Sequence, residues 1–260
     1  MNPWLKLSLE FANQKNYLDE LFRVYPLVPD TSRDLDPDKW EMVTRAFNQQ
    51  DHKRLIESLL NLELFPIKDS YVSYLRRDKE AIARNPKTIN RLCGRLYEMG
   101  LAEMGRRCRE PKETNRQIGP MFRYWIQKGA LGVLPLDWKR FHKSKQDSVM
   151  IGSDAEFKDY AAQYLGYSSD KGLDLICRFN GKIVVGEAKF LSDWGGNQNN
   201  QLEVVQHFLA TDLGDAVKVG IIDGVPYIPS NNKMHKLLVG KLAKQNVMSA
   251  LVLREFLYSL

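Results

Sequence analysis

Residues 171–201 read KGLDLICRFNGKIVVGEAKFLSDWGGNQNNQ. Two apolar runs, LDLICRF and KIVVGEAKF, are separated by Asn180-Gly181. This dipeptide strongly predicts a β-hairpin, because a type I′ turn needs positive φ at both of its central residues. A two-residue turn fixes the register, so counting back along both strands places Asp174 directly opposite Glu187. Lys189 lies two residues beyond Glu187 and therefore points to the same face of the sheet.

Two carboxylates that face each other across a pair of strands repel and destabilise the pair. The rest of this hairpin is apolar on both faces, which is typical of a buried central pair of strands. Buried like charges either take up protons or bind a cation, and a hard divalent ion such as Mg²⁺ takes oxygen ligands. The alternative is an ordinary exposed hairpin with a cross-strand Glu–Lys face, which the apolar flanks disfavour.

The pattern of Asp174, twelve residues, and then Glu187-Ala188-Lys189 resembles the active-site signature of the PD-(D/E)XK nucleases, and in particular of type II restriction endonucleases. Leu173 stands where the signature has Pro. The resemblance implies that Asp174, Glu187 and Lys189 are catalytic. It also implies that Asp174, Glu187 and the main-chain carbonyl of Ala188 bind Mg²⁺, with Mn²⁺ able to substitute, and that hydrolysis leaves 5′-phosphate ends.

The order of expected elements agrees with an α/β nuclease core, a mixed central sheet flanked by helices. We expect a helix over residues 153–164, then the hairpin, a helix over 200–213, a strand over 217–222 with a turn at Asp223-Gly224, a helix over 233–244 and a last strand over 249–253. Residues 1–128 read as mainly helical and residues 129–150 as an irregular connection. We therefore expect two domains: residues 1–148 for DNA recognition and dimerisation, and residues 149–260 for the nuclease core.

The distribution of charge points to a nucleic-acid partner. The chain of 260 residues has a net charge of +6, yet residues 76–145 contain 18 Lys and Arg against 7 Asp and Glu. A local surplus of this kind suits a phosphate backbone, although a solvated basic surface is the alternative. No run of 18 apolar residues predicts a membrane span. Three cysteines without metal-ligand spacing are typical of a reduced, cytoplasmic protein.

Further site residues are expected around the hairpin. In the resembled family, a third carboxylate often comes from the helix before the first core strand, which makes Glu156 a candidate metal ligand. A capping box between Ser153 and Glu156 explains the same residue equally well. Polar residues near the basic segment and in the loop after the hairpin are candidates for contacts to phosphates or base edges, or for a plain polar loop: Arg116, Gln117, Arg123, Asn197, Gln198, Asn200 and Gln201.

The function implied by the resemblance is Mg²⁺-dependent hydrolysis of phosphodiester bonds at a short specific sequence in double-stranded DNA. It implies a homodimer and a cognate DNA methyltransferase in a restriction–modification system. One alternative is a repair or junction-resolving nuclease of the same superfamily that reads DNA shape. Another is a DNA-binding relative that has lost catalysis.

Overall fold

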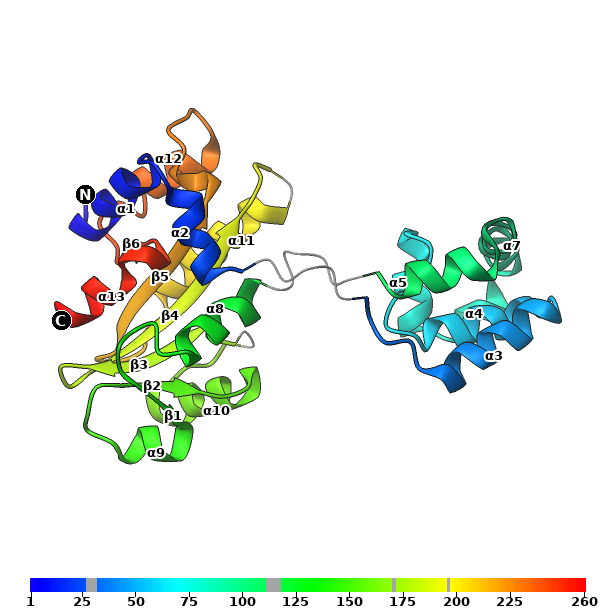
Figure 1. The fold of residues 1–260 in the computed structure, drawn as a ribbon, viewed down its shortest axis with the longest axis horizontal. Helices are drawn as coiled ribbons and strands as arrows, with labels where there is room; N and C mark the ends of the chain where they lie inside the picture. Colours follow the sequence, from blue (N-terminus) through cyan, green and yellow to red (C-terminus); the bar gives the residue numbers. More distant parts are fainter. Residues whose placement is uncertain (27–31, 111–117, 170–171, 196) are drawn as a thin grey trace. The chain divides into compact units, whose positions relative to one another are not determined.

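The computed structural model describes residues 1–26, 32–110, 118–169, 172–195 and 197–260. The chain forms two compact units (Figure 1), one of residues 1–27 and 113–260 and the other of residues 28–112. We call them the sheet unit and the helical unit. The helical unit is therefore an insertion, and the sheet unit is assembled from both ends of the chain.

A mixed sheet forms the centre of the sheet unit. Within the described residues it has six strands in the order β1-β2-β3-β4-β5-β6. The strand β3 runs antiparallel to both of its neighbours, β2 and β4, whereas β1 runs parallel to β2, and β4, β5 and β6 run parallel. Their bounds are Leu134–Asp137, Ser148–Ile151, Leu175–Phe179, Lys182–Leu191, Val217–Gly224 and Val247–Met248. The long strand β4 thus has hydrogen-bonded neighbours on both edges, which buries it.

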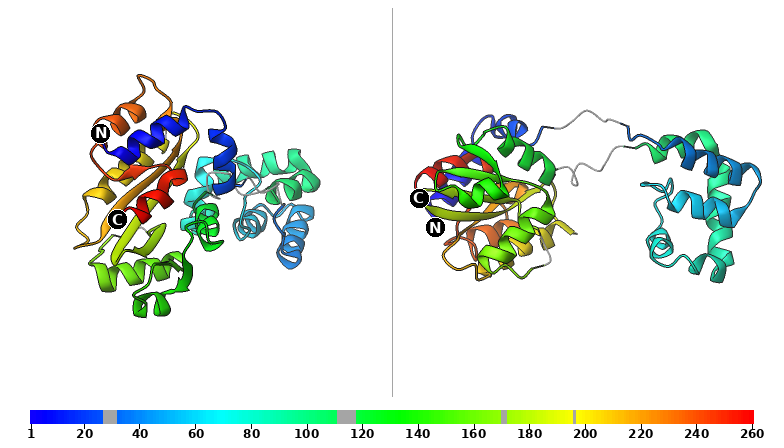
Figure 2. Two further views of the ribbon diagram at one scale, coloured as in Figure 1. Left: turned by 60° about the vertical axis from the view of Figure 1, so that its left-hand side comes forward. Right: turned by 90° about the horizontal axis from the view of Figure 1, so that it is seen from below.

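Helices cover both faces of this sheet. Gly220 of β5 faces Val205 and Leu209 of α11, whereas Asp223, three residues along the same strand, faces α2 and the start of α13. Figures 1 and 2 show α1 in blue beside α13 in red. The helices of the sheet unit are α1 (Pro3–Ala12), α2 (Tyr17–Val24), α8 (Ile118–Gln127), α9 (Trp138–Lys143), α10 (Asp154–Leu165), α11 (Asn197–Ala210), α12 (Lys233–Val239) and α13 (Ala250–Tyr258), with a 3-10 turn at Val225–Tyr227.

A buried carboxylate joins the N-terminal helices to the sheet. The side chain of Asp223 is 0% exposed and accepts hydrogen bonds from the hydroxyls of Tyr25 at 2.9 Å and Ser249 at 2.5 Å. It also accepts one from the amide of Ala250 at 3.2 Å. A buried carboxylate must have such partners. The α2 helix and the start of α13 are therefore fixed to the end of β5.

The helical unit has a separate apolar core, formed by α3 to α7. Its helices are α3 (Pro37–Asn48), α4 (His52–Leu60), α5 (Ser70–Arg77), α6 (Ala81–Arg84) and α7 (Pro86–Cys108). Asp36 caps α3 with its side chain, as the Asp-Pro start predicts. The α7 helix changes direction at Gly100, where φ is 76°.

The structure confirms the mixed α/β core flanked by helices and corrects four expectations. Residues 129–150 are not irregular, because two four-residue strands and α9 form there and extend the sheet. The chain does not divide at residue 148, since residues 118–148 belong to the same compact unit as residues 149–260. The segment 249–253 is the start of α13, capped by Ser249, and not a strand. Asp223 lies within β5 and not in a turn.

Two further properties concern the environment of the chain. None of the helices in the described ranges is long and apolar enough to cross a lipid bilayer. Cys93, Cys108 and Cys177 are buried free thiols.

Candidate active site

The hairpin of β3 and β4 has the expected turn and register. Asn180 and Gly181 have φ values of 49° and 78°, so both central residues of the turn adopt the left-handed conformation. Leu175 pairs with Gly186, in agreement with the register predicted from the two-residue turn. The paired register ends at Leu175, and the amide of Asp174 donates to the carbonyl of Gly186 at 3.0 Å, which holds Asp174 at this end of the hairpin without a direct pair to Glu187.

Three residues of the predicted signature meet at this end of the hairpin. The carboxylate oxygen Oδ2 of Asp174 accepts a hydrogen bond from the amide of Ala188 at 2.9 Å, which holds the aspartate against β4. Glu187 is 6% exposed. Lys189 extends its ammonium group between the two acids: its Nζ is 2.6 Å from Oε1 of Glu187 and 3.4 Å from Oδ2 of Asp174. The structure thus brings Asp174, Glu187 and Lys189 together.

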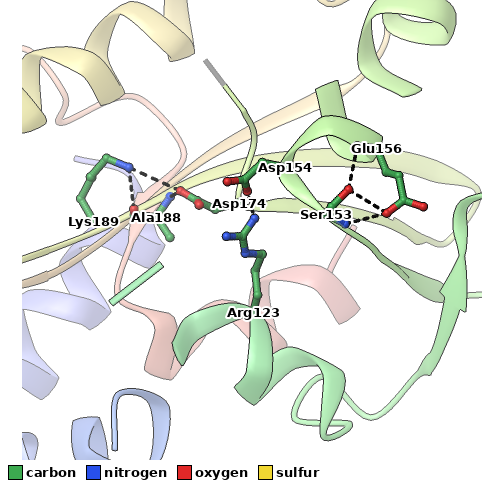
Figure 3. A network of polar contacts seen from close by, with 7 residues as sticks. All are labelled: Arg123, Ser153, Asp154, Glu156, Asp174, Ala188 and Lys189. Carbon is green, nitrogen blue, oxygen red and sulfur yellow. Dashed lines mark hydrogen bonds and ion pairs between the residues drawn. The ribbon is translucent and has the colours of Figure 1, made fainter. Parts of the chain in front are cut away.

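A third oxygen also reaches this ammonium group. Lys189 Nζ donates to the main-chain carbonyl of Ala188 at 2.9 Å (Figure 3). One cationic nitrogen is therefore surrounded by two carboxylate oxygens and one carbonyl oxygen from Asp174, Glu187 and Ala188. Burial lowers the pKa of Lys189, but the charges of Asp174 and Glu187 outweigh this effect and hold its pKa above the ordinary value. The lysine is charged here and a poor proton acceptor.

The donor set can be tested against the expected metal. Within the described residues, no group of three or more His, Cys, Asp or Glu side chains could hold a metal ion. The oxygens that surround Lys189 Nζ come from two carboxylates, Asp174 and Glu187, and from the main-chain carbonyl of Ala188. All three donors are oxygens, and oxygen ligands suit Mg²⁺ and Mn²⁺. Because they already converge on one cation, these residues fit such an ion.

The carboxylates open into a pocket of 460 Å³. Arg123 of α8 and Asp154 of α10 lie in its wall and form an ion pair. Figure 3 shows the guanidinium of Arg123 directed toward Asp154 and close to Asp174. The side chain of Arg123 is 18% exposed and that of Asp154 is 71% exposed. A cation other than Lys189 therefore lines the pocket beside the predicted catalytic residues.

Glu156 has a different environment from the one expected of a metal ligand. Its Oε2 accepts hydrogen bonds from the amide of Ser153 at 2.7 Å and from the hydroxyl of Ser153 at 2.9 Å (Figure 3). This is the capping-box alternative, and it lowers the pKa of Glu156. Asp154, which the sequence reasoning missed, is the acid of α10 that lines the pocket. Side chains two residues apart on a helix point in directions that differ by about 200°. Only one of Asp154 and Glu156 can therefore face the pocket.

The candidate DNA contacts are distributed unevenly. Arg123 and Gln201 line the pocket. Gln198 is engaged in the loop after β4, because its Oε1 accepts from the amide of Asp193 at 3.0 Å and its Nε2 donates to the hydroxyl of Ser192 at 3.2 Å. Asn200 is exposed. Arg116 and Gln117 lie outside the described residues, and the side chain of Asn197 is not described.

Comparison with known proteins gives one decisive match. The model of the family described as Tsp45I type II restriction enzyme matches residues 2–260. The chain belongs to the Tsp45I type II restriction enzyme family. No curated protein and no solved structure matches the chain.

Membership in the Tsp45I family identifies the activity. The protein is a type II restriction endonuclease, an enzyme that cleaves DNA at specific sites. The family match covers both the sheet unit and the helical unit, and so extends well beyond residues 149–260, the expected nuclease core. Neither the structure-selective nuclease nor the inactive DNA-binding relative finds support in the comparisons.

Proposed function

We propose that this restriction endonuclease has a PD-(D/E)XK active site in the pocket beside the β3–β4 hairpin. Asp174, Glu187 and the carbonyl of Ala188 would hold Mg²⁺, with Mn²⁺ able to replace it. The observation that supports this assignment is the convergence of these three oxygens on one cation, Lys189 Nζ, at 2.6 to 3.4 Å. A bound divalent ion polarises phosphoryl oxygens and supplies a more acidic water.

The side chains of the pocket perform the other tasks. Lys189 places a positive charge beside the carboxylates, where it orients the attacking water and offsets charge on the phosphate that is cleaved. Arg123, in the wall of the same pocket, binds phosphate oxygens of the DNA through its guanidinium. Hydrolysis would leave 5′-phosphate and 3′-hydroxyl ends.

The proposal extends to the residues that contact DNA and to the oligomeric state of the enzyme. Gln201 lines the pocket and Asn200 is exposed one residue before it, so both are candidates for contacts to base edges or phosphates. We further propose a homodimer, because a two-fold assembly matches a palindromic or nearly palindromic site. Residues 1–148 would contribute to recognition and dimerisation. A cognate methyltransferase would protect the cell's own DNA, and the cytoplasm, where that DNA lies, would be the place of action.

The test compares the variants Asp174→Asn and Glu187→Gln with Asp159→Asn, which removes the same charge from an exposed position of α10. With phage DNA and Mg²⁺, the first two variants should cut at least about 100-fold more slowly than wild type. Asp159→Asn should cut normally. Sequencing of the ends should give discrete sites with 5′-phosphates. Wild-type rates in either pocket variant would overturn the assignment of the site.

A further inference from the structure

Two large aromatic side chains of the helical unit are exposed to solvent. Tyr71 and Tyr74 on α5 are 61% and 59% exposed, one helical turn apart. The guanidinium of Arg91, on α7, lies over the ring of Tyr71 at 5.6 Å from its centroid. This contact places α5 and α7 on a common surface. Exposed tyrosines beside arginines are typical of a binding surface and not of a merely solvated one.

A row of cations continues along α7. Lys87, Arg91 and Arg95 are all exposed and follow one another at four-residue steps, so they lie on one side of the helix. With Tyr71 and Tyr74 they form what we call the α5–α7 face. At a rise of about 1.5 Å per residue, the three charges are spread over about 12 Å.

One half-buried acid orients two of these arginines. Oδ2 of Asp69 is 2.7 Å from Nη1 of Arg91 and 3.7 Å from Nη1 of Arg95, and the side chain of Asp69 is only 10% exposed. The arginine side chains are 43% and 50% exposed. The hydrogen bond from Arg91 is the main reason why the pKa of Asp69 is lowered. Its charge is thus covered by protein, while both guanidinium groups remain accessible.

We propose that the α5–α7 face binds the phosphate backbone of double-stranded DNA. Lys87, Arg91 and Arg95 would contact phosphates, and the hydroxyls of Tyr71 and Tyr74 would donate hydrogen bonds to them. Three exposed cations outnumber the two acids of this surface, Asp69 and Glu98, which is exposed three residues after Arg95 on the same side of α7, so the face has a net positive charge that complements DNA. A second protein chain is the other occupant that tyrosine and arginine favour, but the exposed lysine and the net positive charge favour phosphate.

The inference deepens the proposed function, because it assigns part of the DNA binding to residues outside the pocket. It depends on the DNA-cleaving activity but not on the assignment of Asp174 and Glu187. The face lies entirely within residues 69–95, and each contact that defines it joins residues of the helical unit.

The experiment uses the full chain with the double substitution Lys87→Gln and Arg95→Gln, which leaves Arg91 to pair with Asp69. The matched control is Arg45→Gln with Lys53→Gln. Both control residues belong to the helical unit, on α3 and α4, and their side chains are 69% and 65% exposed. The affinity for a duplex that contains the cleavage site is measured by fluorescence anisotropy over a range of salt concentrations. Thermal unfolding and sedimentation are recorded for each protein.

We expect the face variant to bind the duplex at least about tenfold more weakly than wild type. In a plot of the logarithm of the binding constant against the logarithm of the salt concentration, the slope of the face variant should be shallower by about 1.8. Each phosphate contact contributes about 0.9 to this slope, and the variant lacks two such contacts. The control should match wild type. As a second variant, Arg95→Lys should retain most of the slope because it keeps the charge. Equal slopes for the face variant and the control would overturn the inference.

Two other outcomes separate this inference from its rivals. An unchanged salt slope together with a change in sedimentation would mean that the face joins two protein chains, which contradicts DNA binding. If the pocket variants Asp174→Asn and Glu187→Gln cut DNA as fast as wild type, the active site proposed above would be refuted. The salt slope would decide the role of the α5–α7 face in that case as well.

Discussion

The buried carboxylate of Asp223 should make the stability of the protein depend on pH in an unusual direction. Burial raises the pKa of Asp223 from 3.8 to about 7, although the hydrogen bonds from Ser249 and Tyr25 and from the amide of Ala250 partly oppose this effect. Because the folded pKa lies above the unfolded one, the stability that the protonated form provides is complete below pH 3.8 and is lost as the pH rises through 7.

The size of the effect follows from these two values. Between them the folded protein holds a proton that the unfolded chain has released, so each pH unit lowers the free energy of unfolding by about 1.4 kcal/mol. Integrated from pH 5 to pH 8, the contribution of Asp223 falls by about 2.5 kcal/mol. Asp223→Asn keeps the shape of the side chain but cannot titrate. If the new side-chain NH₂ group lies against the amide N–H of Ala250, one hydrogen bond is lost. This lowers the free energy of unfolding by an amount that is independent of pH.

The measurement is denaturant-induced unfolding of wild type and Asp223→Asn between pH 5 and pH 8. Groups other than Asp223 titrate in both proteins, so they cancel in the difference. As the pH rises from 5 to 8, the free energy of unfolding of Asp223→Asn should increase by about 2.5 kcal/mol relative to that of wild type. Tyr25→Phe removes a hydrogen bond that lowers the pKa of Asp223, and should therefore move the transition to higher pH. A constant difference between wild type and Asp223→Asn over the whole range would refute the reasoning.

Three other expectations concern single residues. Asp154→Asn should strengthen the binding of DNA several-fold in EDTA, measured by anisotropy, because it removes a negative charge from the pocket and releases Arg123; weaker binding would contradict this. Lys189→Ala should reduce cleavage at least about 100-fold yet retain Mn²⁺ in a calorimetric titration, since the ammonium occupies the same oxygens; loss of Mn²⁺ would count against the site. Gly224→Ala should lower the free energy of unfolding by more than about 2 kcal/mol, because φ is 95° and a Cβ would lie 2.1 Å from the carbonyl oxygen of Leu191; unchanged denaturation would refute it.

The sequence predicts the centre of the site because the information there is local. Asn180-Gly181 determines a two-residue turn, the turn determines the register of Leu175 with Gly186, and this register brings Asp174 and Glu187 to the same end of the hairpin. The apolar residues on both faces indicate a buried pair of strands, and Val184 and Val185 are indeed 0% exposed. No contact with a distant segment is needed at any step.

Elsewhere the decisive contacts are distant in sequence. The choice between Asp154 and Glu156 depends on the position of Arg123, which lies 31 residues before Asp154. The burial of Asp223 depends on Tyr25, 198 residues away. A short apolar run also fits a strand or a helix equally well, so the segment from Ser249 was assigned to the wrong element.

The first helix of the sheet unit is held by residues that are synthesised more than 200 residues later. The hydroxyl of Ser8 accepts the amide of Ser249, 241 residues later, and the amide of Asn2 donates to the carbonyl of Ala243 at 2.6 Å. During synthesis, α1 can therefore not dock in its final place before residues 243–249 have been made. A fragment that ends before these residues would leave Ser8 and the amide of Asn2 without their partners.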